Sequence, residues 1–161
     1  MKDDIHADKK VKLSEILPAM QEVLNREGSV ALTITGTSMY PTILGGRDQV
    51  VLVRSEQPLK KGDLPLYRRD NGQFILHRIV SVERDGTYTC CGDHQWNKEK
   101  GIRSDQILAV TEKICRKGKW FPVNARGYVL WVRFWMRVLP IRKIFIYGIS
   151  FAGKIKRLFI K

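Results

Sequence analysis

The segment from Leu32 to Pro41, Leu-Thr-Ile-Thr-Gly-Thr-Ser-Met-Tyr-Pro, constrains the fold of this chain more than any other. An alternating, strand-like run ends here in a turn. Gly36 permits backbone angles that other residues avoid, and the proline fixes its own φ and disfavours helix at Tyr40. We therefore expect a rigid bend near a strand end, with the hydroxyl of Ser38 presented on it.

The rest of the first two thirds of the chain has the two-residue period of β-strands. We expect strands at Ser29 to Thr35, Gln49 to Arg54, Leu64 to Arg68, Gln73 to Glu83, Thr87 to Cys91 and Ile107 to Ile114. Asp70-Asn71-Gly72 and Asp85-Gly86 are typical of hairpin turns, because Asn and Gly tolerate positive φ. Short strands with turns at this spacing predict a mainly β fold of coiled antiparallel sheets with a small barrel.

Apolar residues recur at helical spacing before the first strand, which predicts one N-terminal amphipathic helix that ends at Gly28. Its apolar face consists of Leu13, Ile16, Leu17, Met20, Val23 and Leu24. We expect three parts in the chain: this N-terminal segment over 1–28, a β domain over 29–112 and a C-terminal tail over 113–161.

The tail carries the whole net charge of +13. No acidic residue follows Glu112, whereas thirteen lysines and arginines do, so the other sixteen basic residues balance the 16 acids. A helix over Ala125 to Leu139 would place Arg126, Arg133 and Arg137 on one stripe of an otherwise apolar surface.

A second tail segment repeats the design, with Lys143, Lys154, Arg157 and Lys161 on one face around the apolar run Ile144 to Gly153. Both segments are too short to cross a bilayer, and we expect them to lie at an anionic membrane surface. Packing on the body or on a partner chain is the alternative. Nucleic acid is not favoured as a partner, because aliphatic residues outnumber what a phosphate-binding helix needs.

The N-terminus is too polar for a signal peptide, and no run of eighteen uncharged apolar residues occurs in the sequence. The three cysteines are an odd number, and Cys90 and Cys91 are adjacent, so we expect thiols in a reducing compartment. These features predict a cytoplasmic protein that is peripheral on the inner membrane face. No metal is expected, because the sequence lacks C-x-x-C spacing, and we expect no cofactor.

His77 and Asp93 are the residues that would make Ser38 chemically useful. His77 lies in the expected strand 73–83, where a histidine on an apolar face is usually a core residue. Asp93 follows a hairpin return, where its carboxylate could reach the imidazole of the preceding strand. Serine on a bend, histidine on a strand and a carboxylate nearby form the arrangement of nucleophile, base and orienting acid.

Five sequence blocks in order carry a family resemblance: Gly36 to Thr42, Gly46 to Val50, Lys61 to Leu64, His77 to Val80, and Gly92-Asp93. Over about residues 30–112 the chain resembles the signal peptidase I and repressor-cleavage superfamily of serine peptidases, S24/S26. The resemblance implies several coiled β-sheets with a small barrel, and Ser38 as the acylating nucleophile.

The residue at the position of the general base indicates which branch of the superfamily the chain resembles. Many members have lysine where this chain has His77, so the chain is more similar to the endoplasmic-reticulum and archaeal type of signal peptidase. In that branch a second acid follows the Gly-Asp pair, which corresponds to Glu99. Asp93 or Glu99 could therefore orient the imidazole, and we favour Asp93 because it retains the residue type. Lys60 or Lys61 could in principle replace His77 as base.

Three departures accompany the resemblance. The sequence has no N-terminal membrane span, and Gly36 replaces a serine that often helps to bind the oxyanion. The oxyanion would rest on the Ser38 amide, with Thr37 or Thr35 as helpers. Pro65 interrupts a β run, which indicates an edge strand.

The resemblance implies a serine endopeptidase that cleaves a leader peptide or preprotein. The alternative is a non-catalytic or self-cleaving regulatory module that binds a peptide, a partner protein or nucleic acid.

Overall fold

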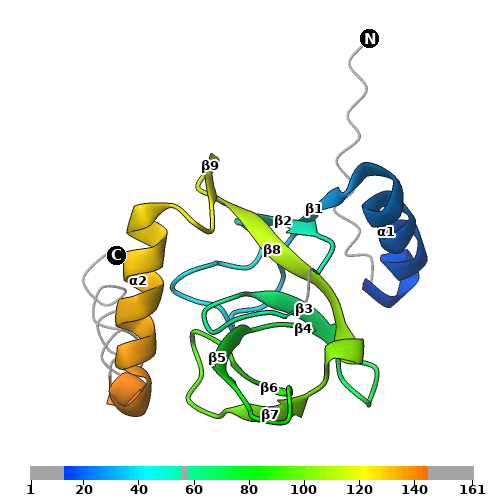
Figure 1. The fold of residues 1–161 in the computed structure, drawn as a ribbon. Helices are drawn as coiled ribbons and strands as arrows, with labels where there is room; N and C mark the ends of the chain where they lie inside the picture. Colours follow the sequence, from blue (N-terminus) through cyan, green and yellow to red (C-terminus); the bar gives the residue numbers. More distant parts are fainter. Residues whose placement is uncertain (1–12, 56–57, 145–161) are drawn as a thin grey trace, which may run out of the picture.

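The computed structural model describes residues 13–55 and 58–144, with a helix at each end and strands between (Figure 1). Its elements are α1 (Leu13–Glu27), β1 (Ser29–Thr33), β2 (Gln49–Val53), β3 (Pro65–Arg68), β4 (Phe74–Leu76), β5 (Arg78–Val82), β6 (Tyr88–Cys91), β7 (Glu99–Ile102), β8 (Ile107–Arg116), β9 (Lys119–Pro122) and α2 (Arg126–Arg137). Two short 3₁₀ turns, η1 (Ser104–Gln106) and η2 (Leu139–Ile141), complete them.

The strands form two antiparallel sheets. The larger has the order β1-β2-β8-β3-β4, with β9 paired to β8, and the smaller has the order β5-β6-β7. The mainly β class and the coiled antiparallel sheets are confirmed. The expected small barrel is not closed within the described residues, because β1 and β4 end the path of the larger sheet without pairing to each other.

The predicted helix over 13–27 is confirmed. Gly28 ends α1 with a φ of 76°, and its N–H donates to the carbonyl of Leu24. Five of the six predicted strands occur with small changes at their ends, the strand predicted over 73–83 is divided in two, and β7 and β9 are additional. β8 runs through Glu112, where we placed the end of the β domain, and the sheet continues into β9.

The edge-strand prediction for Pro65 is wrong. β3 lies between β8 and β4 and pairs with both. Pro65 is tolerated there because it is the first residue of the strand, a position at which the missing N–H costs least.

The predicted strand 73–83 is divided at His77. Its first half, β4, pairs with β3 in the larger sheet, and its second half, β5, pairs with β6 in the smaller one. His77 is therefore the one residue between β4 and β5, where the chain passes from the larger sheet to the smaller one. This is the position that brings it to the candidate site.

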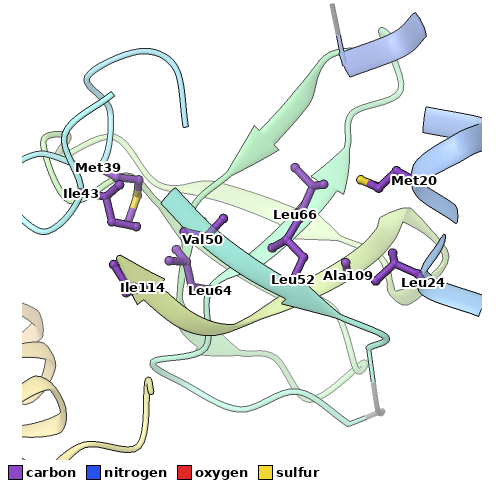
Figure 2. Packing of buried hydrophobic residues seen from close by; sticks show 10 residues of the cluster. All are labelled: Met20, Leu24, Met39, Ile43, Val50, Leu52, Leu64, Leu66, Ala109 and Ile114. Carbon is purple, nitrogen blue, oxygen red and sulfur yellow. The ribbon is translucent and has the colours of Figure 1, made fainter. Parts of the chain in front are cut away.

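The larger core holds the Ser38 turn at one end and α1 at the other (Figure 2). Met39, which is 2% exposed, and Ile43 lie beside Val50, whereas Met20 and Leu24 of α1 lie toward the far end of the cluster. The remaining buried members are Leu52, Leu64, Leu66, Ala109 and Ile114. Burial of Met39 immediately after Ser38 anchors the turn, since a buried side chain of this size contributes about 1.5–3 kcal/mol.

α2 occupies most of the helix predicted over 125–139 and lies on the side of the sheets opposite α1 (Figure 1). Val132 and Trp135 are buried, so part of its apolar surface packs on the body, whereas Leu130 and Phe134 remain exposed. Most of the second predicted tail segment, from residue 145, lies outside the described residues. Among the described helices, none has the length and apolar character needed to cross a bilayer.

Candidate active site

The turn that carries Ser38 is fixed by close backbone contacts. Gly36 has a φ of 84°, in the left-handed region that favours glycine. Gly45 approaches Gly36 so closely that an added Cβ would overlap the Gly36 carbonyl oxygen. Ser38 itself is half-buried, at the surface of a turn whose next residue is in the core. The predicted rigid bend is thus present.

A second turn, over residues 92–95, packs against Ser38. The N–H of His94 donates to the Ser38 carbonyl at 2.8 Å. A Cβ at Gly92 would lie 2.6 Å from the same oxygen, so any side chain there would push the two turns apart. Gly92 directly follows β6, whose Cys91 pairs with Arg78 of β5. Ser38 is therefore attached to the strand pair that begins next to His77.

His77 is 4% exposed and forms part of the wall of a cleft of about 510 Å³. Its ring meets Tyr67 edge-on, with 6.4 Å between the ring centroids. The same cleft is lined by His94, whose N–H holds Ser38, and by Arg69 and Glu99. The imidazole therefore borders a space that a substrate could enter.

Burial lowers the pKa of His77 to about 4, well below the ordinary value. The negative charge of Glu99 is the strongest influence in the opposite direction, while the positive charge of Arg69 adds to the lowering. The imidazole is therefore neutral at pH 7 and can accept a proton. Of the acids near His77, Glu99 favours the charged form of the imidazole most.

The pKa of His77 predicts a specific loss of stability in mild acid. The unfolded imidazole titrates at about 6.5, so below this pH the unfolded chain binds a proton that the folded chain does not. The free energy of unfolding should fall between pH 6.5 and about 4, by up to about 1.4 kcal/mol per pH unit. Denaturant unfolding at several pH values, with His77→Gln as control, measures this loss. Equal pH slopes for both proteins would contradict it.

Glu99 lines the His77 cleft and is held there by two residues, Tyr67 and Arg69. Its Oε2 accepts a hydrogen bond from the Tyr67 hydroxyl at 2.8 Å, and its carboxylate accepts from both Nε and Nη2 of Arg69 at 2.6 Å. Burial alone would raise the pKa of Glu99, but these hydrogen bonds and the Arg69 charge outweigh it and lower the pKa. The cleft thus contains an ionised carboxylate.

Asp93 is fully buried and binds a different partner. Its two carboxylate oxygens accept from Nε and Nη2 of Arg78 at 3.0 and 2.7 Å. Burial alone would lower the pKa of Arg78, but the Asp93 charge outweighs it and raises the pKa. A third nitrogen, Nη1, donates to the Gly62 carbonyl and to the Tyr128 hydroxyl of α2. The Asp93 carboxylate is thus part of a buried ion pair.

Comparison with known protein families places this site in context. A family model described as Peptidase S24-like matches residues 4–113, which is more than half of the chain. The chain belongs to the Peptidase S24-like family. The membership supports the S24/S26 superfamily and its serine peptidase-type fold, with Ser38, His77, Asp93 and Glu99 all inside the matched region. No curated protein and no solved structure matches the chain at a significant level.

The structure of this Peptidase S24-like chain brings the Ser38 turn and His77 to the same end of the small sheet. Within the described residues no hydrogen bond joins the two side chains, and catalytic hydrogen bonds often tighten only when substrate binds. Thr37 and Thr35 are exposed on the Ser38 turn. Lys60 and Lys61 line a different groove, against α2, and do not line the His77 cleft.

Sequence reasoning missed His94, Tyr67 and Arg69 as members of the site. His94 borders the cleft beside the Ser38 turn and meets Tyr40 edge-on at 5.4 Å. Its position directly after Gly92-Asp93 was a usable signal. The sequence holds no such signal for Tyr67 and Arg69, because their position in the site depends on how β3 pairs with β8.

The helix α2 lies beyond the family match yet supports the site. Trp135 Nε1 donates to the Asp93 carbonyl at 3.0 Å, and the fully buried Arg142 donates to the carbonyls of Gly92 and Gln95. Trp131 Nε1 donates to the Thr42 hydroxyl, four residues after Ser38. Both turns of the site are thus held by residues that follow the matched region.

Proposed function

We propose that this protein is a serine endopeptidase that cleaves leader or precursor peptides, with Ser38 as nucleophile and His77 as general base. One observation carries the proposal: the turn of Ser38 is hydrogen-bonded to His94, which lines the same cleft as His77. The histidine in place of lysine supports the signal peptidase branch that uses a Ser-His pair. Peptides are the substrate class that the family membership supports.

The reaction is acyl transfer. His77 accepts the proton of the Ser38 hydroxyl as Oγ bonds to the scissile carbonyl carbon, and the imidazolium gives that proton to the leaving amine as the peptide bond breaks. A water molecule then gives a proton to His77 as its oxygen attacks the acyl carbon, and the imidazolium returns that proton to Ser38 Oγ as the ester bond breaks, which releases the acid product. The low pKa of His77 keeps the imidazole in the neutral form that both steps require.

The Ser38 amide is the donor we assign to the oxyanion. Within residues 13–55 and 58–144 this N–H has no hydrogen-bond acceptor, which is the state that an oxyanion donor needs. Thr37, exposed on the same turn, is the second candidate donor through its hydroxyl. Gly36 has no side chain that could bind the oxyanion. The backbone would therefore contribute more to oxyanion binding here than in relatives with a serine at this position.

We assign the orienting role to Glu99, because it lines the cleft together with His77 whereas Asp93 does not, and because its negative charge favours the imidazolium of His77. A carboxylate beside the base stabilises the imidazolium that forms during acylation. Asp93, paired with Arg78, holds the 92–95 turn on which Ser38 rests. Our preference for Asp93 from the sequence stays untested, and the variants described in the Discussion separate the two acids.

Mapping of new peptide termini tests the proposed activity. Purified protein is incubated with cell lysate, and termini that appear are compared with those from the Ser38→Ala protein. We expect cleavage sites that are present only with the wild-type chain. Identical sets of termini from both proteins would contradict a peptidase that acts on other chains.

A regulatory module of the same fold is the second candidate, and the absence of a side-chain oxyanion donor at Gly36 favours it. Such a module would either cleave itself or bind a partner without turnover. The mass of the purified chain after prolonged incubation separates these cases, since self-cleavage yields two fragments that Ser38→Ala does not give.

A further inference from the structure

A groove of about 710 Å³ separates α2 from the loop that precedes β3. Leu64, Tyr128, Val132 and Met136 are among its apolar lining residues. Four exposed cations border it, Lys60 and Lys61 from the loop and Arg133 and Arg137 from α2. Asp63 is its one acid among the described lining residues, and a carboxylate oxygen of Asp63 accepts from the Lys60 N–H. The groove thus combines an apolar floor with a strongly cationic rim.

The exposed face of α2 continues the same chemistry. Leu130 and Phe134 are 64% and 48% exposed, and Arg126, Arg133 and Arg137 are exposed at neighbouring positions of the helix. Ile141 and Ile144 extend the apolar surface past the helix at 51% and 72% exposed. These residues, with the groove, define the α2 surface.

We propose that the α2 surface binds an anionic lipid bilayer. The described tail from 113 to 144 contains no acid, and none of the four cations of the groove forms an ion pair with a described residue. These positive charges therefore favour an anionic partner. The apolar floor and the exposed leucine, phenylalanine and isoleucines would enter the boundary between headgroups and acyl chains. Lipid phosphates would meet the lysines and arginines of the rim.

The remainder of the chain is a poor occupant for this surface. Residues 145–161 carry Lys154, Lys156, Arg157 and Lys161 and no acid, so the four cations of the groove would repel them. A flat nucleic-acid backbone would satisfy the cations but would leave the exposed apolar side chains in water. A bilayer satisfies both sets at once.

The α2 surface reaches the mouth of the candidate active site. Lys143, which follows η2, lies over the ring of Trp96 at 5.6 Å, and Trp96 lines the His77 cleft. A chain bound through α2 would therefore hold this cleft near the membrane surface. This consequence rests on the proposed function, whereas lipid binding does not.

Sedimentation of the full chain with vesicles tests the proposal. We expect binding to phosphatidylcholine vesicles that contain phosphatidylserine, weaker binding at high salt, and little binding to phosphatidylcholine alone. Arg133→Glu with Arg137→Glu should weaken binding on the order of 25-fold or more, at about fivefold for each cation lost. Leu130→Ser with Phe134→Ser should weaken it about tenfold for each side chain and leave the remainder more sensitive to salt.

The matched control is Arg26→Glu with Arg54→Glu, which makes the same charge change on two exposed residues, one in α1 and one directly after β2. α1 lies on the other side of the molecule from α2 (Figure 1). The control protein should bind almost as wild type does. Point variants are preferable to removal of the tail after Glu112, because that cut would divide β8. Ser38→Ala should bind normally, which separates lipid binding from catalysis.

Two results would overturn the proposal. One is equal sedimentation of the wild type and the Arg133→Glu, Arg137→Glu protein. The other is retention on duplex DNA without sedimentation with anionic vesicles. Unchanged thermal unfolding of the variants confirms that each remains folded.

Discussion

Ser38→Ala and His77→Ala should each abolish peptide cleavage, and both should fall to a similar residual rate. Members of one catalytic unit are not additive, so the double variant should be no slower than either single one. We expect a loss in kcat on the order of 10⁴-fold or more from each change. Single-turnover cleavage of a peptide found by terminus mapping provides the measurement.

Three other residues serve as controls for the identity of the base. His94 lines the cleft with His77, and Lys60 and Lys61 line the groove beside α2. Lys60→Ala and Lys61→Ala should cleave normally, and His94→Ala should keep far more activity than His77→Ala. If His94→Ala or a lysine variant is inactive while His77→Ala cleaves, His77 is not the base.

The local features of the site could be predicted from the sequence because short-range chemistry determines them. The bend at Ser38 follows from Gly36 and Pro41, and the helix end at Gly28 follows from one left-handed residue. The strand over 73–83 had the right composition. Its division at His77 could not be predicted, because the two halves choose partners, β3 and β6, that lie elsewhere in the chain.

The partner of Asp93 shows the same limit. His77 and Arg78 are neighbours in the sequence, and the Asp93 carboxylate pairs with Arg78. Whether the Asp93 carboxylate binds His77 or Arg78 depends on the register of β5 with β6, in which Arg78 pairs with Cys91. The hydrogen bonds from Trp135 and Arg142 to the 92–95 turn could not be predicted either, because they join residues more than forty positions apart in the sequence.

Breaking the buried Arg78–Asp93 pair should have the largest effect on stability. Both side chains are 1% exposed, so Arg78→Met or Asp93→Asn would leave its partner without its charged counterpart in the interior. The free energy of unfolding should fall by about 3–5 kcal/mol for either change. The double variant Arg78→Met, Asp93→Asn should lose much less than the sum, because no unpaired charge remains. Denaturant unfolding of the four proteins measures this coupling, and additive losses would contradict it.

The same buried pair separates the two candidate orienting acids when activity is read alongside stability. If Asp93 only holds its turn, conditions that keep Asp93→Asn folded should restore most of its cleavage rate. Glu99→Gln should instead remain well folded and cleave slowly. Because the Glu99 charge raises the pKa of His77, its removal should lower that pKa further and move the acid limb of kcat/KM to lower pH. An unshifted limb in Glu99→Gln, together with an inactive but folded Asp93→Asn, would return the orienting role to Asp93.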